Sequence, residues 1–398
     1  MFKKREKEVL PEGVKKSVSK EVFIFSAIFF GVFTLLGSKM GAANMFNTMM
    51  NTAHDLLINT VFYIMAIAVL AGAVSALWSE FGLIALLNKL LSPMIKPLFG
   101  LPGASAVGIF TTYLSDNPAI LALADDNNFR RYFRKYQLPA LCNIGTSFGM
   151  GLIITTFMIG LKSPVGENFG LAVVVGNIGA IIGSIVSTRL MLRQTAKIYG
   201  KEALCEVHGE ETEAQIDINR LRRVRRGGVG SRFIDALLEG GKCGVDMGLS
   251  IIPGVLIICT LVMMLTNAMP EGGYTGAAYE GIALLPWIGE KIQFILMPIF
   301  GFSSAESIAV PITALGAAGA AIGIVENLIT AGLANAHDVA VFTAMCMCWS
   351  GYLSTHVAMM DSLKCNDLTG KAISSHTIGG LCAGFAANWI YKLLMMIL

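Results

Sequence analysis

One long apolar stretch, residues 297–330, constrains the fold more than any other part of the chain. It reads MPIFGFSSAESIAVPITALGAAGAAIGIVENLIT and is apolar enough to lie in a bilayer. Gly301, Glu306 and Pro311 interrupt its first half, although an unbroken helix needs no such interruptions. Non-helical backbone survives at membrane depth only where protein or a water-filled cavity satisfies its polar groups. The pattern therefore predicts a re-entrant helical hairpin that enters and leaves the membrane on one side.

An earlier part of the chain repeats this pattern, in a second broken apolar segment near residues 93–128. Short matches link the two halves of the sequence in one order, at offsets between 200 and 204 positions: 97–101 (PLFGL) with 298–302 (PIFGF), 140–142 with 344–346, and 178–180 with 378–380. Any one of these matches is uninformative by itself. A nearly constant offset over about 80 residues indicates an internal duplication.

The composition is that of a polytopic membrane protein. Of 398 residues, 54% are hydrophobic and 14% are charged, whereas a soluble protein carries about 25% charged residues. The net charge of +3 comes from basic residues gathered in a few loops, which suits membrane topology better than nucleic-acid binding. The eight cysteines show no zinc-type spacing and are expected to be free thiols, with no bound metal. No nucleotide-binding loop and no hydrolase motif is present, so we expect no enzyme activity.

Membrane spans need about 20 apolar residues, and the sequence predicts them at 22–36, 57–78, 138–159, 169–190, 233–267, 339–362 and 372–394. Two amphipathic segments, 80–91 and 285–296, are expected to lie at the interface. The positive-inside rule places the basic N-terminus, the 130–135 cluster and the 193–231 loop in the cytoplasm. Threading the chain under these constraints works only if both broken segments are re-entrant.

The predicted fold is therefore an all-α polytopic membrane protein with two inverted repeats, each carrying a re-entrant helical hairpin, plus an extra N-terminal span. Inverted repeats with discontinuous helices that meet near the midplane are typical of secondary transporters. The predicted divisions are a cytoplasmic N-terminal segment with the first span at 1–54, repeat 1 at 55–192, a cytoplasmic polar loop at 193–231, and repeat 2 at 232–398.

Residues 97–106 (PLFGLPGASA) follow an amphipathic segment and precede a broken hydrophobic one. In this the chain resembles the Gate ("nucleoside recognition") domain family of bacterial membrane proteins, over most of residues 55–398. Related domains occur in concentrative nucleoside transporters, whose two hairpins and two unwound helices hold nucleoside and cation. The resemblance implies the bacterial inner membrane, a cytoplasmic N-terminus and a homo-oligomer. The chain departs from those transporters by lacking their fuller polar motifs, so the substrate stays open.

Glu306 is the first candidate site residue, because a carboxylate within a membrane costs roughly 2.5–3.5 kcal/mol on insertion scales and is retained for function. Its carboxylate is suited to bind a coupling cation, a proton or a substrate amine. The alternative is that this end of the hairpin lies at the membrane interface, where water solvates the carboxylate. Ser303 and Ser304 are candidate hydroxyl ligands for the same guest, or turn formers. Asp116 and Asn117 occupy the corresponding break in the first half, where Asp116 is a candidate partner of Glu306 in cation coupling. Asp-Asn-Pro is also ordinary turn chemistry.

Two polar helix faces complete the candidate site. Asn143 and Ser147 are four residues apart and lie on one face, and Tyr352, Thr355 and His356 form a similar face in the second half. Such faces either line a cavity or hydrogen-bond to a neighbouring helix.

These features predict a secondary active transporter of a small polar metabolite, nucleoside-like or amino-acid-like, with alternating access and coupling to Na⁺ or H⁺ and no other cofactor. The expected partners are the substrate, the lipid bilayer and further copies of the chain, with no nucleic acid. Two alternatives stay open at this point: a non-transporting Gate-type component that acts with a partner subunit, and a metal-ion permease that uses the repeat-equivalent Cys142 and Cys346.

Overall fold

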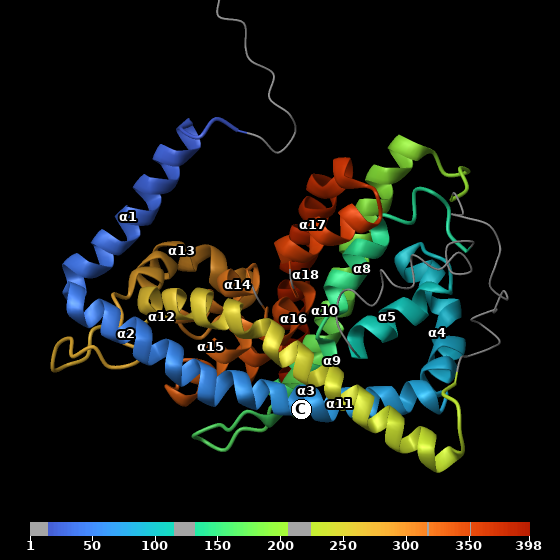
Figure 1. Cartoon of the computed structure of the whole chain (residues 1–398), viewed down its shortest axis with the longest axis horizontal. Helices are drawn as coiled ribbons and strands as arrows, with labels where there is room; N and C mark the ends of the chain where they lie inside the picture. The colour runs from blue at the N-terminus through green and yellow to red at the C-terminus, as the bar shows by residue number, and fades with distance from the viewer. Residues whose placement is uncertain (1–14, 115–131, 206–223, 317, 351) are drawn as a thin grey trace, which may run out of the picture.

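The computed structural model describes residues 15–114, 132–205 and 224–398, apart from residues 317 and 351, and Figure 1 shows its course. Within these residues the named elements are all helices. Six helical stretches are long and apolar enough to cross a membrane: Lys20–Met40, Ala42–Glu80, Ala140–Gly160, Gly170–Tyr199, Val229–Thr266 and Asn366–Ile397. The predicted class, an all-α polytopic membrane protein with an additional N-terminal helix, is confirmed.

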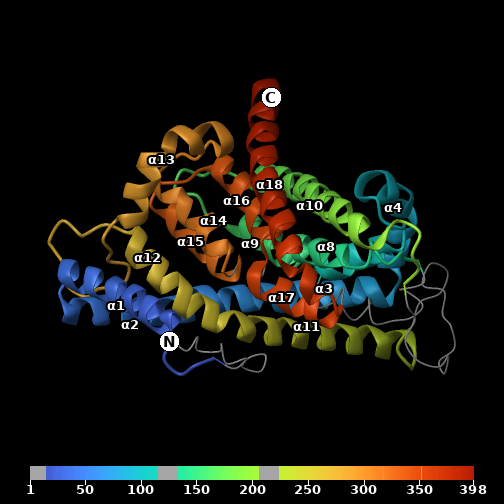
Figure 2. The same cartoon turned by 90° about the horizontal axis from the view of Figure 1, so that it is seen from above.

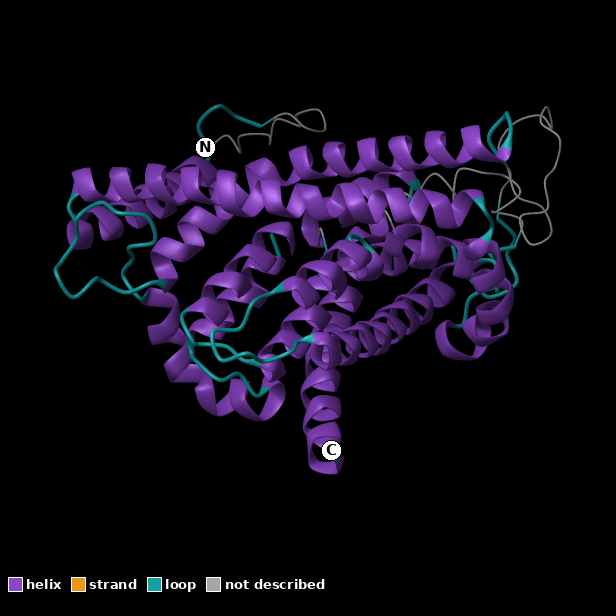
Figure 3. Cartoon of the chain, turned by 90° about the horizontal axis from the view of Figure 1, so that it is seen from below, coloured by secondary structure: helices purple, strands orange, loops and turns teal. Residues whose placement is uncertain are grey.

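Two long composite helices lie side by side along one side of the molecule (Figures 2 and 3). The first consists of α2 (Ala42–Asp55), the π-helix η1 (Leu56–Val61) and α3 (Phe62–Glu80); the second consists of α11 (Val229–Gly254), the π-helix η2 (Val255–Cys259) and α12 (Thr260–Thr266). Gly72 faces Gly240, and Gly244 faces Ala68, so α3 and α11 run antiparallel. Small residues allow this close approach, which is the usual basis of helix association in lipid. α1 (Lys20–Met40) precedes this layer.

A second pair, α10 (Gly170–Tyr199) and α18 (Thr369–Ile397), crosses at the centre of the molecule. A Cβ built on Gly183 would lie 2.5 Å from the Gly379 carbonyl oxygen, and a Cβ on Gly379 would lie 2.7 Å from the Gly183 carbonyl oxygen. Gly179 faces Ala383 in the same register, so these helices are also antiparallel. The small-residue stripes of the two helices are thus the contact between them.

The two crossings have the same symmetry. α10 and α18 are equivalent in the two halves, and their contacts are reciprocal: Gly183 faces Gly379, the equivalent of Gly179, and Gly179 faces Ala383, the equivalent of Gly183. η1 and η2 occupy corresponding places in the two composite helices and also contact each other. Copies of one helix that cross antiparallel at the same internal position are related by a twofold axis through the crossing. This is the geometry of inverted repeats, as predicted from the sequence.

Two predicted spans prove to be interrupted. The span predicted at 138–159 consists of α8 (Ala140–Phe148) and α9 (Gly151–Gly160), and the span predicted at 339–362 consists of α16 (Ala336–Cys348) and α17 (Tyr352–Ser362). The first break falls at Gly149 and Met150, and Met150 has a φ of 57°. A side chain on Gly151 would overlap the ring of Tyr113, so glycine is needed where α9 begins. Hydropathy alone did not reveal these breaks, because the broken segments remain apolar.

Two amphipathic helices lie at opposite ends of the molecule, as Figures 1 and 2 show. They are α4 (Leu83–Phe99) and α13 (Leu284–Phe300), which match at an offset of 201 positions at both ends. Each ends in a left-handed glycine, Gly100 with φ 77° and Gly301 with φ 68°. The repeated P-x-F-G sequence is therefore a helix C-cap, for which glycine is the favoured residue.

The ends of these two helices are held by corresponding side chains of the central pair. Arg189 of α10 donates from Nε to the Leu98 carbonyl at 2.8 Å, and Asn388 of α18 donates from Nδ2 to the Ile299 carbonyl at 2.9 Å. Beyond these helices come short elements that are too short to span a membrane: α5 (Ser105–Leu114) in the first half, and η3 (Glu306–Ile308), α14 (Ala309–Ala314) and α15 (Ala318–Thr330) in the second. η4 (Asn366–Leu368) precedes α18.

Candidate functional site

A buried group of polar side chains lies where the two broken helices meet the central helix pair. We call it the central polar cluster; it comprises Asn143 and Ser147 of α8, Ser187 of α10, Cys348 of α16, Tyr352 and His356 of α17, and His376 of α18. All seven are buried. Residues from both sequence halves contribute, so the cluster lies at the repeat interface, where transporters of this architecture place their sites.

A chain of hydrogen bonds connects four helices, α8, α10, α18 and α16. Asn143 Nδ2 donates to Ser187 Oγ at 2.8 Å and to the Ala372 carbonyl at 3.0 Å. Ser187 Oγ lies 2.9 Å from His376 Nδ1, and His376 Nε2 contacts the carbonyl of Cys348. A carbonyl oxygen can only accept, so His376 Nε2 carries the proton and Nδ1 accepts from Ser187. The broken helices are thereby fixed to α10 and α18.

The second part of the cluster is built on α17. His356 Nδ1 lies 2.6 Å from the Tyr352 carbonyl, one turn earlier, and the Tyr352 hydroxyl is hydrogen-bonded to Thr377 of α18. The imidazole rings of His356 and His376 have centroids 4.7 Å apart. Cys142 of α8 has its sulfur 4.0 Å from the His356 carbonyl. α17 therefore places its histidine directly between α8 and α18.

The loop that leads into η3 forms a separate polar group. Ser303 donates its backbone N–H to Asp338 Oδ1 at 2.9 Å, and its hydroxyl accepts from Asn335 Nδ2 at 2.7 Å. Asp338 Oδ2 also accepts from the Asn335 N–H at 3.0 Å, which closes a capping box at the start of α16. Asp338 is fully buried. One carboxylate thus joins the loop before η3 to a broken helix.

Glu306 lies next to this group, half-buried in the first position of η3. No hydrogen bond or ion pair joins its carboxylate to another described residue, whereas the Ser304 hydroxyl lies 3.2 Å from the Ser307 hydroxyl.

The predicted site residues divide into two groups in space. Asn143, Ser147, Tyr352 and His356 meet in the central polar cluster, and Thr355 lies half-buried on the same helix as the last two. Ser303 belongs instead to the separate group around Asp338, and Ser304 and Glu306 follow it in the loop and at the start of η3. The two predictions in the first hairpin, Asp116 and Asn117, lie outside the described residues.

Four participants were not predicted as site residues: Ser187, Cys348 and His376 of the central polar cluster, and Asp338 of the loop group. Ser187 and His376 lie beside the glycines through which α10 and α18 contact each other, and such glycines indicate helix packing rather than a polar site. Asp338 has a recognisable signal, because Asn335 three residues before it forms an N-x-x-D capping pattern ahead of an apolar run. That pattern predicts a helix start, but it gives no sign of the bond to Ser303.

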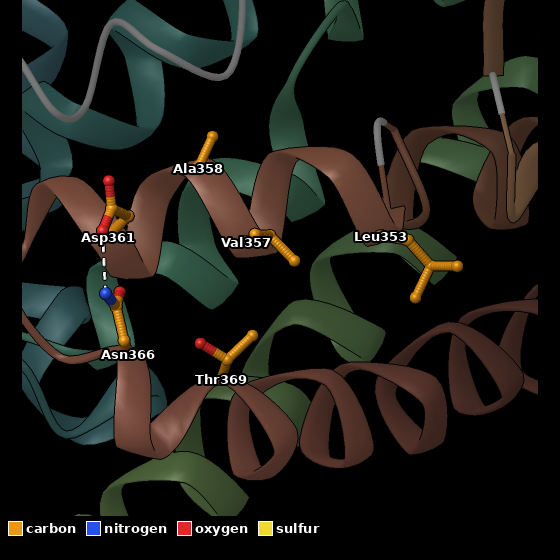
Figure 4. Close-up of a pocket in the computed structure, with 6 residues that line it drawn as sticks. All are labelled: Leu353, Val357, Ala358, Asp361, Asn366 and Thr369. Carbon is orange, nitrogen blue, oxygen red and sulfur yellow. Dashed lines mark hydrogen bonds between the residues drawn. The ribbon is translucent and has the colours of Figure 1, made fainter. Parts of the chain in front are cut away.

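A surface pocket of about 860 Å³ lies on the outer side of α17, and Figure 4 shows it lined by Leu353, Val357, Ala358, Asp361, Asn366 and Thr369. Asp361 accepts a hydrogen bond of 2.7 Å from Asn366 across its narrow end. None of the predicted site residues is among those that line it. The pocket is on the face of α17 away from the cluster, since Leu353 and Val357 are exposed whereas Tyr352 and His356 are buried.

Comparisons with known proteins give a fold likeness. No protein-family model and no curated protein matches the sequence. Solved structures of CNTnw, a concentrative nucleoside transporter, do match: a variant in an outward-facing state has 12% identity and a TM-score of 0.55, covering 94% of this chain and 85% of that chain. CNTnw in an inward-facing substrate-bound state has 12% identity and a TM-score of 0.50, with 94% and 87% covered. The chain thus shares the fold of a membrane transporter.

Proposed function

We propose that this chain is a secondary active transporter of a small polar metabolite, nucleoside-like or amino-acid-like, working by alternating access and driven by a cation or proton gradient. It would act as a Gate-type homo-oligomer in the bacterial inner membrane, with a cytoplasmic N-terminus. The observation that carries the proposal is the central polar cluster, a set of buried polar side chains at the junction of two interrupted helices from opposite repeats.

The physical argument concerns the cost of such a cluster. Polar groups within a membrane protein are expensive unless they hydrogen-bond, and they persist there where they bind or conduct something polar. Interrupted helices add free backbone groups at the same depth. The fold supports the same conclusion, because the similar CNTnw structures include both outward-facing and inward-facing states.

Coupling is assigned to Glu306, with Asp116 as its proposed partner in the first hairpin. Glu306 combines partial burial with a carboxylate that no described residue engages. Asp338 keeps the preceding loop in place through Ser303. A Na⁺ ion or a proton that binds Glu306 would therefore act on a loop attached directly to α16, which ends in the central polar cluster.

Uptake into proteoliposomes tests this proposal. A purified chain that takes up labelled nucleosides or amino acids under an inward Na⁺ or H⁺ gradient supports it, and a chain that moves none of them under either gradient refutes it. Glu306→Gln should abolish gradient-driven uptake while leaving the helical circular dichroism unchanged. Glu271→Gln, at an exposed position of the 267–283 loop, is the matched control. Equal gradient-driven uptake by the two variants would remove Glu306 from the coupling role.

A further inference from the structure

The central polar cluster has unused hydrogen-bond acceptors of fixed chemistry. The first is Asn143 Oδ1, which is buried and has no partner among the described residues. The orientation of the amide is settled, because Nδ2 faces the Ala372 carbonyl at 3.0 Å and a carbonyl requires a donor. The remaining amide atom is therefore an oxygen that can only accept.

The second acceptor is His356 Nε2. The other ring nitrogen, Nδ1, lies 2.6 Å from the Tyr352 carbonyl and must carry the proton to make that bond. A neutral imidazole has one N–H, so Nε2 presents a bare lone pair. This nitrogen is also buried without a partner in the described part of the chain.

The donors of the cluster are already used. The Ser187 hydroxyl donates to His376 Nδ1, and His376 Nε2 donates to the Cys348 carbonyl. The Tyr352 hydroxyl donates to Thr377, whose own hydroxyl donates to a carbonyl of α18 at 2.8 Å. The cluster as defined contains no Lys or Arg. The two acceptors without partners therefore need hydrogen-bond donors that the cluster itself does not supply.

Two neighbouring hydroxyls do not alter this balance. Ser184 and Thr188 of α10 are buried, and neither hydroxyl has a partner among the described residues. A hydroxyl both donates and accepts and can rotate to suit its neighbour. These two hydroxyls therefore do not specifically require a donor, whereas Asn143 Oδ1 and His356 Nε2 do.

We propose that Asn143 Oδ1 and His356 Nε2 form a binding site for the donor groups of the transported solute: N–H or O–H groups, or a small cation. A buried acceptor without a partner is costly, and a donor removes that cost. A carboxylate or phosphate instead places negative charge against two lone pairs, with no cation to offset it. The inference rests on the proposed function and narrows its substrates to neutral or cationic solutes.

Two substitutions at one position test the site. His356→Asn keeps an amide nitrogen near the position of Nδ1, facing the Tyr352 carbonyl, and removes Nε2; His356→Gln reaches the position of Nε2 and is the matched control. The probes are uridine, its fully N- and O-methylated derivative without donors, ethanolamine and succinate. We expect His356→Asn to weaken equilibrium binding of the donor-bearing probe about tenfold, the effect of one lost hydrogen bond, and His356→Gln to weaken it less. Binding of succinate or of the methylated derivative as tight as that of uridine overturns the site.

Binding and spectroscopy separate this inference from transport itself. Nitrogen-15 spectra of histidine-labelled protein should show an unprotonated Nε2 at His356, and a protonated Nε2 overturns the site whatever is transported. Equal binding of the donor-bearing probe by His356→Asn and His356→Gln also overturns the proposed site. A buried water would then be the partner of Asn143 Oδ1 and His356 Nε2. Binding that is sensitive to His356→Asn but accompanied by no uptake would refute transport while keeping the site.

Discussion

The crossing of α10 and α18 gives a sharp test of the inverted-repeat architecture. Gly183→Ala adds one methyl group at the point where the helices are closest. Its Cβ would lie 2.5 Å from the Gly379 carbonyl oxygen and 2.6 Å from the Cβ of Ala383. Neither atom belongs to a flexible side chain, so the helices must move apart by about 1 Å to reach an ordinary carbon contact.

The expected cost follows from two opposing effects. Overpacking of a well-packed interface costs about 1–3 kcal/mol, and replacing glycine by alanine inside a helix returns about 0.5–1 kcal/mol. Gly183→Ala should therefore lower the free energy of unfolding by about 1–2 kcal/mol. Gly379→Ala should behave alike, because its Cβ would lie 2.6 Å from that of Ser187.

Gly31→Ala in α1 is the matched control. Its Cβ would have nothing within 4 Å, so only the helix-propensity gain of about 0.5–1 kcal/mol applies. The assay is denaturant unfolding in detergent micelles, followed by circular dichroism, with all three variants at one protein concentration. If Gly183→Ala proves as stable as Gly31→Ala, the close contact is absent and the twofold crossing is wrong.

Two further predictions concern charge and thiols. Burial raises the pKa of Glu280 in the 267–283 loop, but hydrogen bonds from Thr275 and Gly276 outweigh this and lower the pKa overall. The stabilisation by the ionised carboxylate is present above the ordinary carboxyl pKa and is lost as pH falls through the lower folded pKa. Glu280→Gln should therefore flatten the fall in thermal midpoint between about pH 5 and pH 3, and an unchanged slope would contradict this. N-ethylmaleimide should label the exposed thiol of Cys243 in the native protein, whereas the buried thiols of Cys142 and Cys346 should react only after unfolding. Mass spectrometry identifies the labelled residues. Labelled Cys142 in the native protein would refute the packing of α8.

The two amphipathic helices and the duplication could be recognised without coordinates. The P-x-F-G match at 97–100 and 298–301 recurs because both copies end an amphipathic helix with a left-handed glycine. This requirement concerns only a few neighbouring residues, so it can be recognised in the sequence. The helix breaks at Gly149 and Trp349 are harder to recognise in the sequence, because an apolar helix with a short interruption has nearly the same hydropathy as a continuous helix.

The sequence by itself determined the class of protein, the two-copy design and the polar faces of α8 and α17, because these follow from hydropathy, spacing and helical periodicity. Only the tertiary structure decided that Asn143 and His356 share one cluster with Ser187 and His376, while Ser303 contacts Asp338 in a separate group. The reason is physical: such neighbours depend on how antiparallel helices cross, and the crossing is set by glycine contacts between segments about 200 residues apart. The spacing of residues within one helix does not show which residues of the other helix will contact it at the crossing.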